Sequence, residues 1–243
     1  MKYYEMHEVV YQRIKNEGHL SWDKSSTFED MWLHGTNTGL KNHLTKVGLD
    51  FKNLNVLDLG TGTGTSALFC AKEGARCIGV EISKTAIDIA IKSAKTLELD
   101  IEFIVGDILD VHLNKEFDLV IDSTVLHCIV GDKDRMAFYQ TAKRHLHANG
   151  YLFINTMISQ GDMSSHFPKE YFHYEDEILW SLGISEITER KTIDGKSYFA
   201  HRTLLSVENQ IEEFSHNGFK IVSTEITSES DVNCMVALLK LKT

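Results

Sequence analysis

The chain has 243 residues, a length that suits one α/β domain with additional elements and a substantial buried core. Its formal net charge of −10 argues against nucleic acid as the main partner, because phosphate binding favours a basic surface. No apolar run approaches the length of a membrane span, and the charged N-terminus is unlike a signal peptide. The composition therefore predicts a soluble, cytoplasmic protein with neither a membrane nor a nucleic-acid partner.

The cysteines and histidines form no pattern typical of a metal site or a disulfide framework. The four cysteines are scattered and include no Cys-x-x-Cys pair, which predicts small core residues in a reducing compartment. The twelve histidines include no His-Glu-x-x-His or His-x-x-x-His arrangement. We therefore predict no metal ligands.

The segment before the first predicted core strand is expected to be helical. Residues 9–14 form an amphipathic stretch, and residues 36–47 form a further helix candidate. Ser26 and Glu29 match a capping box before a short helix through Trp32.

The run from Val56 to Gly64, VLDLGTGTG, is the most informative feature of the chain. Its apolar residues predict a buried strand. Gly60 and Gly62 predict a sharp turn with room for a ligand against the main chain, and residues 66–72 are predicted to be helical. A strand, a glycine turn and a helix form a nucleotide-binding corner in doubly wound α/β folds.

Two common nucleotide motifs do not fit this run. The third small position of a dinucleotide fingerprint is Thr65 here, which disfavours a nicotinamide-dependent oxidoreductase. A phosphate loop needs a lysine after the glycines, and the chain has none there.

Acidic residues follow the next two predicted strands. Glu81 ends a strand over residues 76–81, about 20 residues past the glycine turn, where doubly wound folds set a carboxylate against ribose hydroxyls. A solvated strand end is the alternative for Glu81. Asp107 follows a strand over residues 101–105, and a turn-forming role is its alternative, because Gly-Asp is a common turn pair.

A fourth strand is predicted over residues 117–122, and it leads into the stretch from Ser123 to His127. The carboxyl ends of parallel strands meet at one edge of a sheet, so these residues and the earlier acids are expected to face one crevice. The imidazole of His127 titrates in the range that acid–base catalysis uses. Its alternative role is local packing or hydrogen bonding on a helix.

These motifs, taken together, resemble those of the class I S-adenosylmethionine (SAM) methyltransferases. The run DLGTGTG closely resembles their motif I, and the later motifs follow in the same order at similar intervals. The resemblance covers residues 53–158 well and the C-terminal part more loosely. It implies a doubly wound, seven-stranded, mostly parallel Rossmann-like sheet, with SAM as methyl donor and S-adenosylhomocysteine as product.

The resemblance also implies roles for particular residues. Glu81 would contact the ribose, Asp107 the adenine amino group, and Ile108 the face of the adenine ring. Asp58 could instead brace the loop amides without contacting the ligand. The cofactor-binding residues expected in this way are Trp32, Gly35, Asp58, Gly60, Thr61, Gly62, Glu81, Ile82, Asp107, Ile108, Asp122 and Ser123.

The helical segment over residues 1–50 is expected to form a lid over the cofactor, as methyltransferases of this type often have. Packing is the expected role of Trp22, whereas packing and ligand contact are both open for Trp32. His127 is expected to act on or orient the methyl acceptor. Asp122 would bound the methyl-transfer channel, and these two are the expected catalytic residues.

The remaining elements complete the expected sheet. A helix over residues 132–147 ends at Asn149 and Gly150, and a fifth strand follows over residues 151–157. A helix over 206–217 precedes two strands, which the resemblance implies to be an antiparallel ribbon.

About 50 residues between the fifth strand and the last helix exceed what a minimal core needs. Asp194 and Gly195 predict a hairpin turn between strands over 187–192 and 196–204. The resemblance implies that this insertion caps the acceptor site, and the alternative is an arm that joins a homodimer. The candidate substrate-binding residues are His127, His166, His173, His201 and Arg202.

These predictions define a single methyltransferase domain. It would comprise a lid over residues 1–50, a cofactor-binding core over 51–157, a substrate cap over 158–205 and the rest of the core over 206–243.

The expected reaction is methyl transfer from SAM to an oxygen, nitrogen or sulfur atom of a small molecule. The chain lacks the [ND]-P-P-[YFW] motif common in methyltransferases of exocyclic and amide nitrogen, and residues 122–129 resemble thiopurine- and tellurite-methylating enzymes. An RNA or protein methyltransferase and a non-catalytic SAM-binding module are the alternatives.

Overall fold

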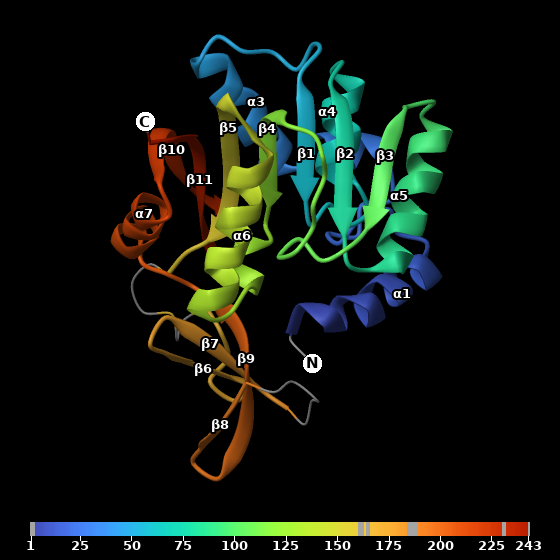
Figure 1. The fold of residues 1–243 in the computed structure, drawn as a ribbon. Helices are drawn as coiled ribbons and strands as arrows, with labels where there is room; N and C mark the ends of the chain where they lie inside the picture. The colour runs from blue at the N-terminus through green and yellow to red at the C-terminus, as the bar shows by residue number, and fades with distance from the viewer. Residues whose placement is uncertain (1–2, 160–162, 164–165, 184–188, 230–231, 243) are drawn as a thin grey trace.

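A seven-stranded sheet forms the centre of the computed structural model, which describes residues 3–159, 163, 166–183, 189–229 and 232–242 (Figure 1). The strand order is β10-β11-β5-β4-β1-β2-β3. β1 to β5 pair in parallel, whereas β11 runs antiparallel to both β5 and β10. The mostly parallel sheet and the C-terminal antiparallel ribbon are therefore confirmed. The strands are β1 (Asn55–Leu59), β2 (Arg76–Glu81), β3 (Ile101–Val105), β4 (Phe117–Ser123), β5 (Leu146–Met157), β10 (Phe219–Glu229) and β11 (Val232–Leu241).

Helices cover both faces of this sheet. One apolar cluster packs α6 (Asp132–His145) and α7 (Val207–His216) against it, and a second packs α3 (Gly35–Lys46) and α4 (Thr65–Lys72) against the opposite face. β1 shows why: Leu57 belongs to the first cluster and Val56 to the second, since neighbouring side chains of a strand face opposite ways. A strand buried on both faces therefore carries apolar side chains on both of them, although β1 also contains the buried Asp58.

The junction between α6 and β5 differs from the sequence-based prediction. The helix ends at His145 and β5 begins at Leu146, before the Asn149-Gly150 pair that suggested a turn. A Cβ atom on Gly150 would lie 2.9 Å from the carbonyl oxygen of Phe117. Gly150 therefore permits the close approach of two strands. The sequence alone does not distinguish this role of a glycine from a role in a turn.

The insertion after β5 forms a second, four-stranded sheet of order β6-β7-β9-β8 (Figure 1). Its strands, all antiparallel, are β6 (Phe172–Glu175), β7 (Ile178–Leu182), β8 (Arg190–Ile193) and β9 (Lys196–Thr203). Asp194 and Gly195 have positive φ angles of 48° and 75°, as a tight hairpin turn requires. The predicted hairpin is thus confirmed where it is described; its residues 187–188 lie outside the described part.

The N-terminal segment contributes a short 3-10 helix, η1 (Tyr3–Met6), followed by α1 (His7–Glu17) and α2 (Phe28–Trp32). α1 crosses the edge at which the parallel strands β1, β2 and β3 end (Figure 1). The capping box of α2 is formed by Thr27 and Asp30, one residue later than predicted. Among the described residues, no helix has both the length and the apolar composition that a bilayer crossing requires.

Helix α5 (Lys84–Thr96) joins the lid to the core. The Ser83 hydroxyl accepts a hydrogen bond from the Ala86 amide and so caps this helix, as predicted. The carboxylate of Glu8 in α1 accepts hydrogen bonds from the hydroxyls of Ser83 and Thr85, both at 2.5 Å. The N-terminal helix is therefore fastened to the first turn of α5.

Candidate functional site

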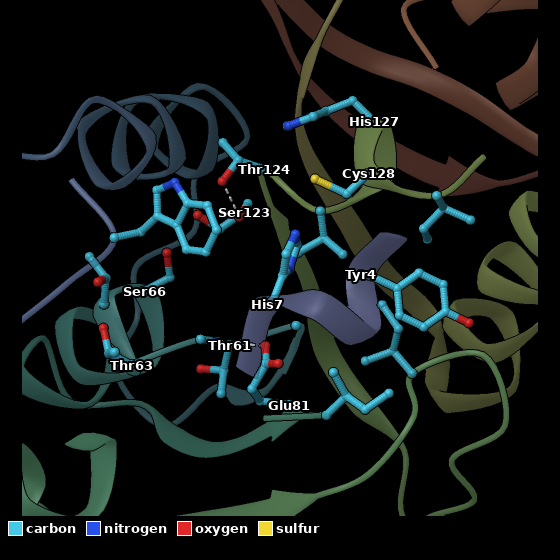
Figure 2. A pocket seen from close by; sticks show the side chains of 18 of the residues that line it. Tyr4, His7, Thr61, Thr63, Ser66, Glu81, Ser123, Thr124, His127 and Cys128 are labelled. Carbon is cyan, nitrogen blue, oxygen red and sulfur yellow. Dashed lines mark hydrogen bonds between the residues drawn. The ribbon is translucent and has the colours of Figure 1, made fainter. Parts of the chain in front are cut away.

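A cavity of about 430 Å³ lies at the carboxyl edge of the parallel strands. Segments that follow β1, β2, β3 and β4 line it, together with Met157 at the end of β5. The N-terminal segment, Arg202 of β9, and Val232 and Cys234 of β11 complete its wall, so the lid and the insertion both reach it. Figure 2 shows labelled side chains from several of these segments around this space.

The glycine turn forms the floor of the cavity beside β1. Gly60 and Gly62 both line it, with positive φ angles of 74° and 55°. A Cβ atom on Gly60 would lie 2.5 Å from Cγ2 of Val125, and one on Gly62 would lie 2.7 Å from the hydroxyl of Tyr11. Both backbone conformation and space therefore require glycine here.

Asp58 lies behind this turn. Its carboxylate accepts a 2.6 Å hydrogen bond from the hydroxyl of Thr61, and burial raises its pKa to about 6. Thr61 lines the cavity, whereas Asp58 does not. The structure thus gives Asp58 the contacts of the bracing alternative.

Glu81 lies at the end of β2 and faces the cavity, although only 6% of the residue is exposed. Its carboxylate accepts hydrogen bonds from the amides of Gly62 at 3.1 Å and Ser83 at 2.9 Å. Burial raises the pKa of Glu81, while these amides oppose the rise. The acid therefore links the glycine turn to the start of α5, and its remaining lone pairs are available to a ligand.

The end of β3 also reaches the cavity. Asp107, Ile108 and Ile82 all line it, which brings together residues that the sequence analysis assigned to the cofactor. Asp107 accepts a 2.9 Å hydrogen bond from the amide of Leu109, the turn contact that was its alternative role. The two roles are compatible, because a carboxylate has further lone pairs.

Asp122 closes the turn after β4 and does not line the cavity. It is fully buried and accepts hydrogen bonds from the amides of Val125 at 2.7 Å and Leu126 at 3.3 Å. Burial raises its pKa to about 7. Asp122 therefore shapes the loop that carries His127, whereas its neighbour Ser123 is the residue that reaches the cavity.

His127 lies in the 3-10 turn η2 (Leu126–Cys128) and lines the cavity, where Figure 2 shows it beside Cys128. Its Nδ1 atom accepts a 3.2 Å hydrogen bond from the amide of Met157, so the neutral ring carries its proton on Nε2. Burial, followed by the charges of Arg202 and Arg135, holds the pKa of His127 well below its ordinary value. The ring is thus a neutral hydrogen-bond donor rather than a base.

The lid places a different tryptophan at the cavity from the one that the sequence favoured. Trp22 lines the cavity, whereas Trp32 stacks on Phe28 at 6.1 Å and has the ammonium group of Lys72 4.9 Å from its ring. Gly35 does not line the cavity either; its neighbour His34 does. Helical periodicity predicts which residues lie on one face of a helix, but it does not predict which part of the protein that face packs against.

A stripe of lid residues escaped the sequence analysis. Tyr4, His7 and Tyr11 all line the cavity, and their spacing of three and four residues is that of one helix face. That spacing was the signal available in the sequence. Trp22 meets the rings of His7 and Tyr11 edge-on, at centroid distances of 5.1 and 5.4 Å.

Of the candidates in the insertion, only Arg202 lines the cavity. His201, its neighbour in β9, lies where the pairing with β7 is irregular, and its ring centroid is 5.9 Å from that of Phe172. His173 lies 3.8 Å from the carboxylate of Glu175 in β6. His166, like His173 and His201, is outside the cavity lining, so the structure does not bring these three histidines to the site.

Two further lining residues are small. The hydroxyl of Ser66, in the first turn of α4, is buried and has no hydrogen-bond partner among the described residues. Cys128 contributes its sulfur to the wall, so this cysteine is more than a core residue. No group of three or more histidine, cysteine or acidic side chains in the described part of the chain is arranged to hold a metal ion.

Residues 50–228 match the family model described as a methyltransferase domain. The cypemycin N-terminal methyltransferase of a Streptomyces species is 34% identical over 101 residues, which are 41% of this chain and 40% of that protein. The release factor glutamine methyltransferase of Flavobacterium psychrophilum is 33% identical over 129 residues, 42% of this chain and 45% of that protein. The chain thus matches less than half the length of either relative.

Solved structures share the whole fold at low sequence identity. The 1,6-didemethyltoxoflavin-N1-methyltransferase of Burkholderia thailandensis, solved with S-adenosylhomocysteine bound, superposes with a TM-score of 0.66 at 13% identity. The match covers 98% of this chain and 88% of that one. These relatives methylate different kinds of acceptor, so they do not single out the thiopurine- and tellurite-methylating type. Because the family model matches well over half of the residues, this chain belongs to the methyltransferase-domain family.

Proposed function

We propose that this protein transfers a methyl group from SAM to an oxygen, nitrogen or sulfur atom of a small molecule. The observation that carries the proposal is the position of Glu81, a buried carboxylate that faces the cavity directly beside the glycine turn. A ligand with a vicinal diol fits such a carboxylate, because two hydroxyl donors match its free lone pairs.

The chemistry of the cavity wall fits the rest of the donor. Asp107 offers an acceptor to an amino group, and Ile108 offers an apolar surface to a ring, at the end of β3. At the other side of the glycine turn, the buried hydroxyl of Ser66 needs a polar partner. SAM has a diol, an adenine ring and an amino-acid group, which together meet these requirements.

When bound, SAM would supply a methyl group on a sulfonium: an electron-rich acceptor atom would form a bond to the methyl carbon, in line, as the carbon–sulfur bond breaks and the sulfur leaves as a neutral thioether. The task of the protein is then mainly alignment, since correct positioning of two reactants lowers the barrier strongly. The cavity would hold both molecules against the carboxyl edge of the sheet. Asp122 and Asp58 hold the two loops in place from behind.

His127 is proposed to orient the acceptor. Its Nδ1 atom is occupied by the Met157 amide, and its low pKa keeps the ring neutral, so Nε2 can donate a hydrogen bond. A base is unnecessary where the acceptor arrives deprotonated or carries a free lone pair. Any proton that leaves the acceptor therefore passes to water rather than to His127.

The small size of the acceptor is inferred from the volume and the lining of the site. The cavity of about 430 Å³ must hold both the donor and the acceptor. Helices of the lid and Arg202 of the insertion contribute to its wall, and both restrict the space for a large acceptor. The net charge of −10 also disfavours RNA as the acceptor.

Incubation with methyl-labelled SAM and fractionated cell metabolites tests this proposal. We expect label in the small-molecule fraction, at a level that falls strongly in Glu81→Ala. Label found in added protein or RNA would support the alternative acceptor class. Binding of the donor with no transfer to any fraction would support a non-catalytic SAM-binding module.

A further inference from the structure

Arg202 brings an unusual positive charge into the wall of the cavity. It projects from β9 of the insertion and lines the cavity beside Cys128 and Met157. Its Nη1 atom lies 3.6 Å from the sulfur of each of these residues. Thiol and thioether sulfurs are weak acceptors, so they satisfy little of a guanidinium with five N–H donors.

No carboxylate of the described residues lies within ion-pair distance of Arg202. The acids that line the cavity are Glu81 at the end of β2, Asp107 after β3, and Asp23 of the lid, whose carboxylate accepts hydrogen bonds from the hydroxyls of Ser21 and Ser25. Arg202 instead lies near the end of β5, through Met157. In the order β5-β4-β1-β2 these ends are three strand spacings apart, or about 14 Å at about 4.8 Å each.

The imidazoles near Arg202 add no second positive charge. Burial, then the charge of Arg202, lowers the pKa of His7 to about 4 and that of His201 to about 3. The same two causes lead the lowering of the pKa of His127. This end of the cavity therefore combines one permanent cation with neutral rings and sulfur atoms.

We propose that the methyl acceptor is a small carboxylate, or an equivalent oxyanion, whose charged group is bound by Arg202. A partly buried guanidinium with no carboxylate partner among the described residues favours a bound anion, and its planar donor pair matches a carboxylate. The anion anchors the acceptor under the insertion and presents its nucleophile towards His127 and the donor. This inference rests on the proposed function and adds the substrate class to it.

The carboxylate of the donor SAM is the alternative anion for Arg202. The geometry disfavours this alternative, because the buried Ser66 hydroxyl and the first amides of α4 offer the donor carboxylate a site beside β1. Arg202 lies beyond β4, next to the end of β5. Each occupant predicts a different effect of removing the guanidinium, so one set of variants separates them.

Calorimetry on the full chain saturated with S-adenosylhomocysteine tests the inference. The probes are a series of carboxylates from acetate to benzoate, each paired with its uncharged amide. We expect at least one carboxylate to bind about tenfold or more tightly than its amide, since charge-assisted hydrogen bonds are among the strong ones. Arg202→Met should abolish this preference, and Arg202→Lys should restore part of it.

Lys196→Met is the matched control, since it removes one exposed positive charge from the same strand and should leave the preference unchanged. All three variants should keep the affinity for S-adenosylhomocysteine, which also shows that they fold. The inference is overturned if no carboxylate is preferred over its amide, or if Arg202→Met keeps the preference. A loss of S-adenosylhomocysteine affinity in Arg202→Met would assign Arg202 to the donor, and no such binding in the unaltered protein would overturn the proposed function itself.

Discussion

The space around Gly60, in the glycine turn at the end of β1, is too small for a Cβ atom. Gly48 and Gly60 have nearly equal φ angles of 73° and 74°, yet a Cβ atom on Gly48 would meet nothing within 4 Å. The same atom on Gly60 would overlap the side chain of Val125. The two positions therefore separate the cost of a left-handed backbone from the cost of lost space.

Gly48→Ala and Gly60→Ala should differ in stability for this reason. In both variants, the left-handed backbone conformation of the alanine lowers the free energy of unfolding by about 1–2 kcal/mol. Gly60→Ala should lose a further amount of about 1–3 kcal/mol, the usual range for overpacking. Urea unfolding of the two variants measures the difference, and equal free energies of unfolding would show that the loop around Val125 yields without cost.

The second prediction at the residue scale concerns the pH dependence of stability. The pKa of Asp122, about 7, lies above the value of about 3.9 for an aspartate in an unfolded chain. The folded state binds the proton more tightly, so this contribution to stability is complete below about pH 4 and is lost as the pH rises to about 7. Asp122→Asn keeps an oxygen for the Val125 amide and removes the buried charge. At pH 8 this variant should melt above the unaltered protein by about 2–8 °C, the shift that 1–2 kcal/mol gives in a chain of this size.

The gain in Asp122→Asn should shrink at pH 5, where the carboxyl of the unaltered protein is mostly protonated. Asp110→Asn is the control, since that carboxylate is exposed and its removal changes the net charge equally. A variant that melts lower than the unaltered protein at pH 8 would mean that the ionised form of Asp122 stabilises the loop.

The sequence predicted residues of the strand ends better than residues of the lid and insertion. Gly60, Glu81 and Asp107 follow strands whose apolar runs are unmistakable, so their meeting at one edge follows from topology. Trp22 and Arg202 reach the same cavity through tertiary packing of other elements. Trp22 lies in the turn between α1 and α2, and Arg202 lies in β9; the periodicity of the sequence does not determine which neighbour covers either residue.

At the scale of elements, α1 is attached to the core through Glu8. Its carboxylate accepts hydrogen bonds from the hydroxyls of Ser83 and Thr85 and from the Thr85 amide. Burial raises and these hydrogen bonds lower the pKa of Glu8, with a net decrease. The attachment is therefore complete near neutral pH and weakens only as the pH falls through that lowered value.

Glu8→Ala should loosen the lid. We expect the affinity for S-adenosylhomocysteine to fall by about fivefold, the effect of about 1 kcal/mol of net hydrogen bonding. Amide hydrogen exchange over residues 7–17 should speed up at the same time. Glu17→Ala removes an equal charge from the exposed end of the same helix and should change neither measurement. Unaltered exchange in Glu8→Ala would show that aromatic packing alone holds α1.

The elements themselves were predictable to different degrees. Strands β1 to β4 and the cap of α5 at Ser83 follow from local sequence, because burial on both faces and capping leave clear signals. The start of β5 was placed too late, since Gly150 serves a close strand contact rather than a turn. The capping box of α2 lies one residue from the predicted one, because Thr27 and Asp30 offer the same chemistry as Ser26 and Glu29.

At the scale of the whole molecule, the acidic surface bears on the class of acceptor. A net charge of −10 opposes the counter-ion release that drives binding to RNA. Filter binding with total RNA at about 50 mM salt, a concentration that favours electrostatic contacts, should therefore show no retention. Tight retention that falls steeply with added salt would favour the RNA methyltransferase alternative.

The fold brings the separate observations into one site. The sheet order places the ends of β1, β2, β3 and β4 at one edge, the lid covers that edge, and the insertion adds Arg202. The central claim is that this edge binds the adenosyl group of SAM, with Glu81 at the ribose. Everything that concerns the acceptor depends on this placement of the donor.

Calorimetric titration with S-adenosylhomocysteine tests that claim most directly. Glu102→Ala is the control, because Glu102 is an exposed acid on the neighbouring strand β3 that pairs with Lys115. The account predicts binding by the unaltered protein and by Glu102→Ala, and an affinity at least about tenfold weaker in Glu81→Ala, as the loss of a carboxylate that accepts two hydroxyl donors implies. Unchanged affinity in Glu81→Ala would contradict it.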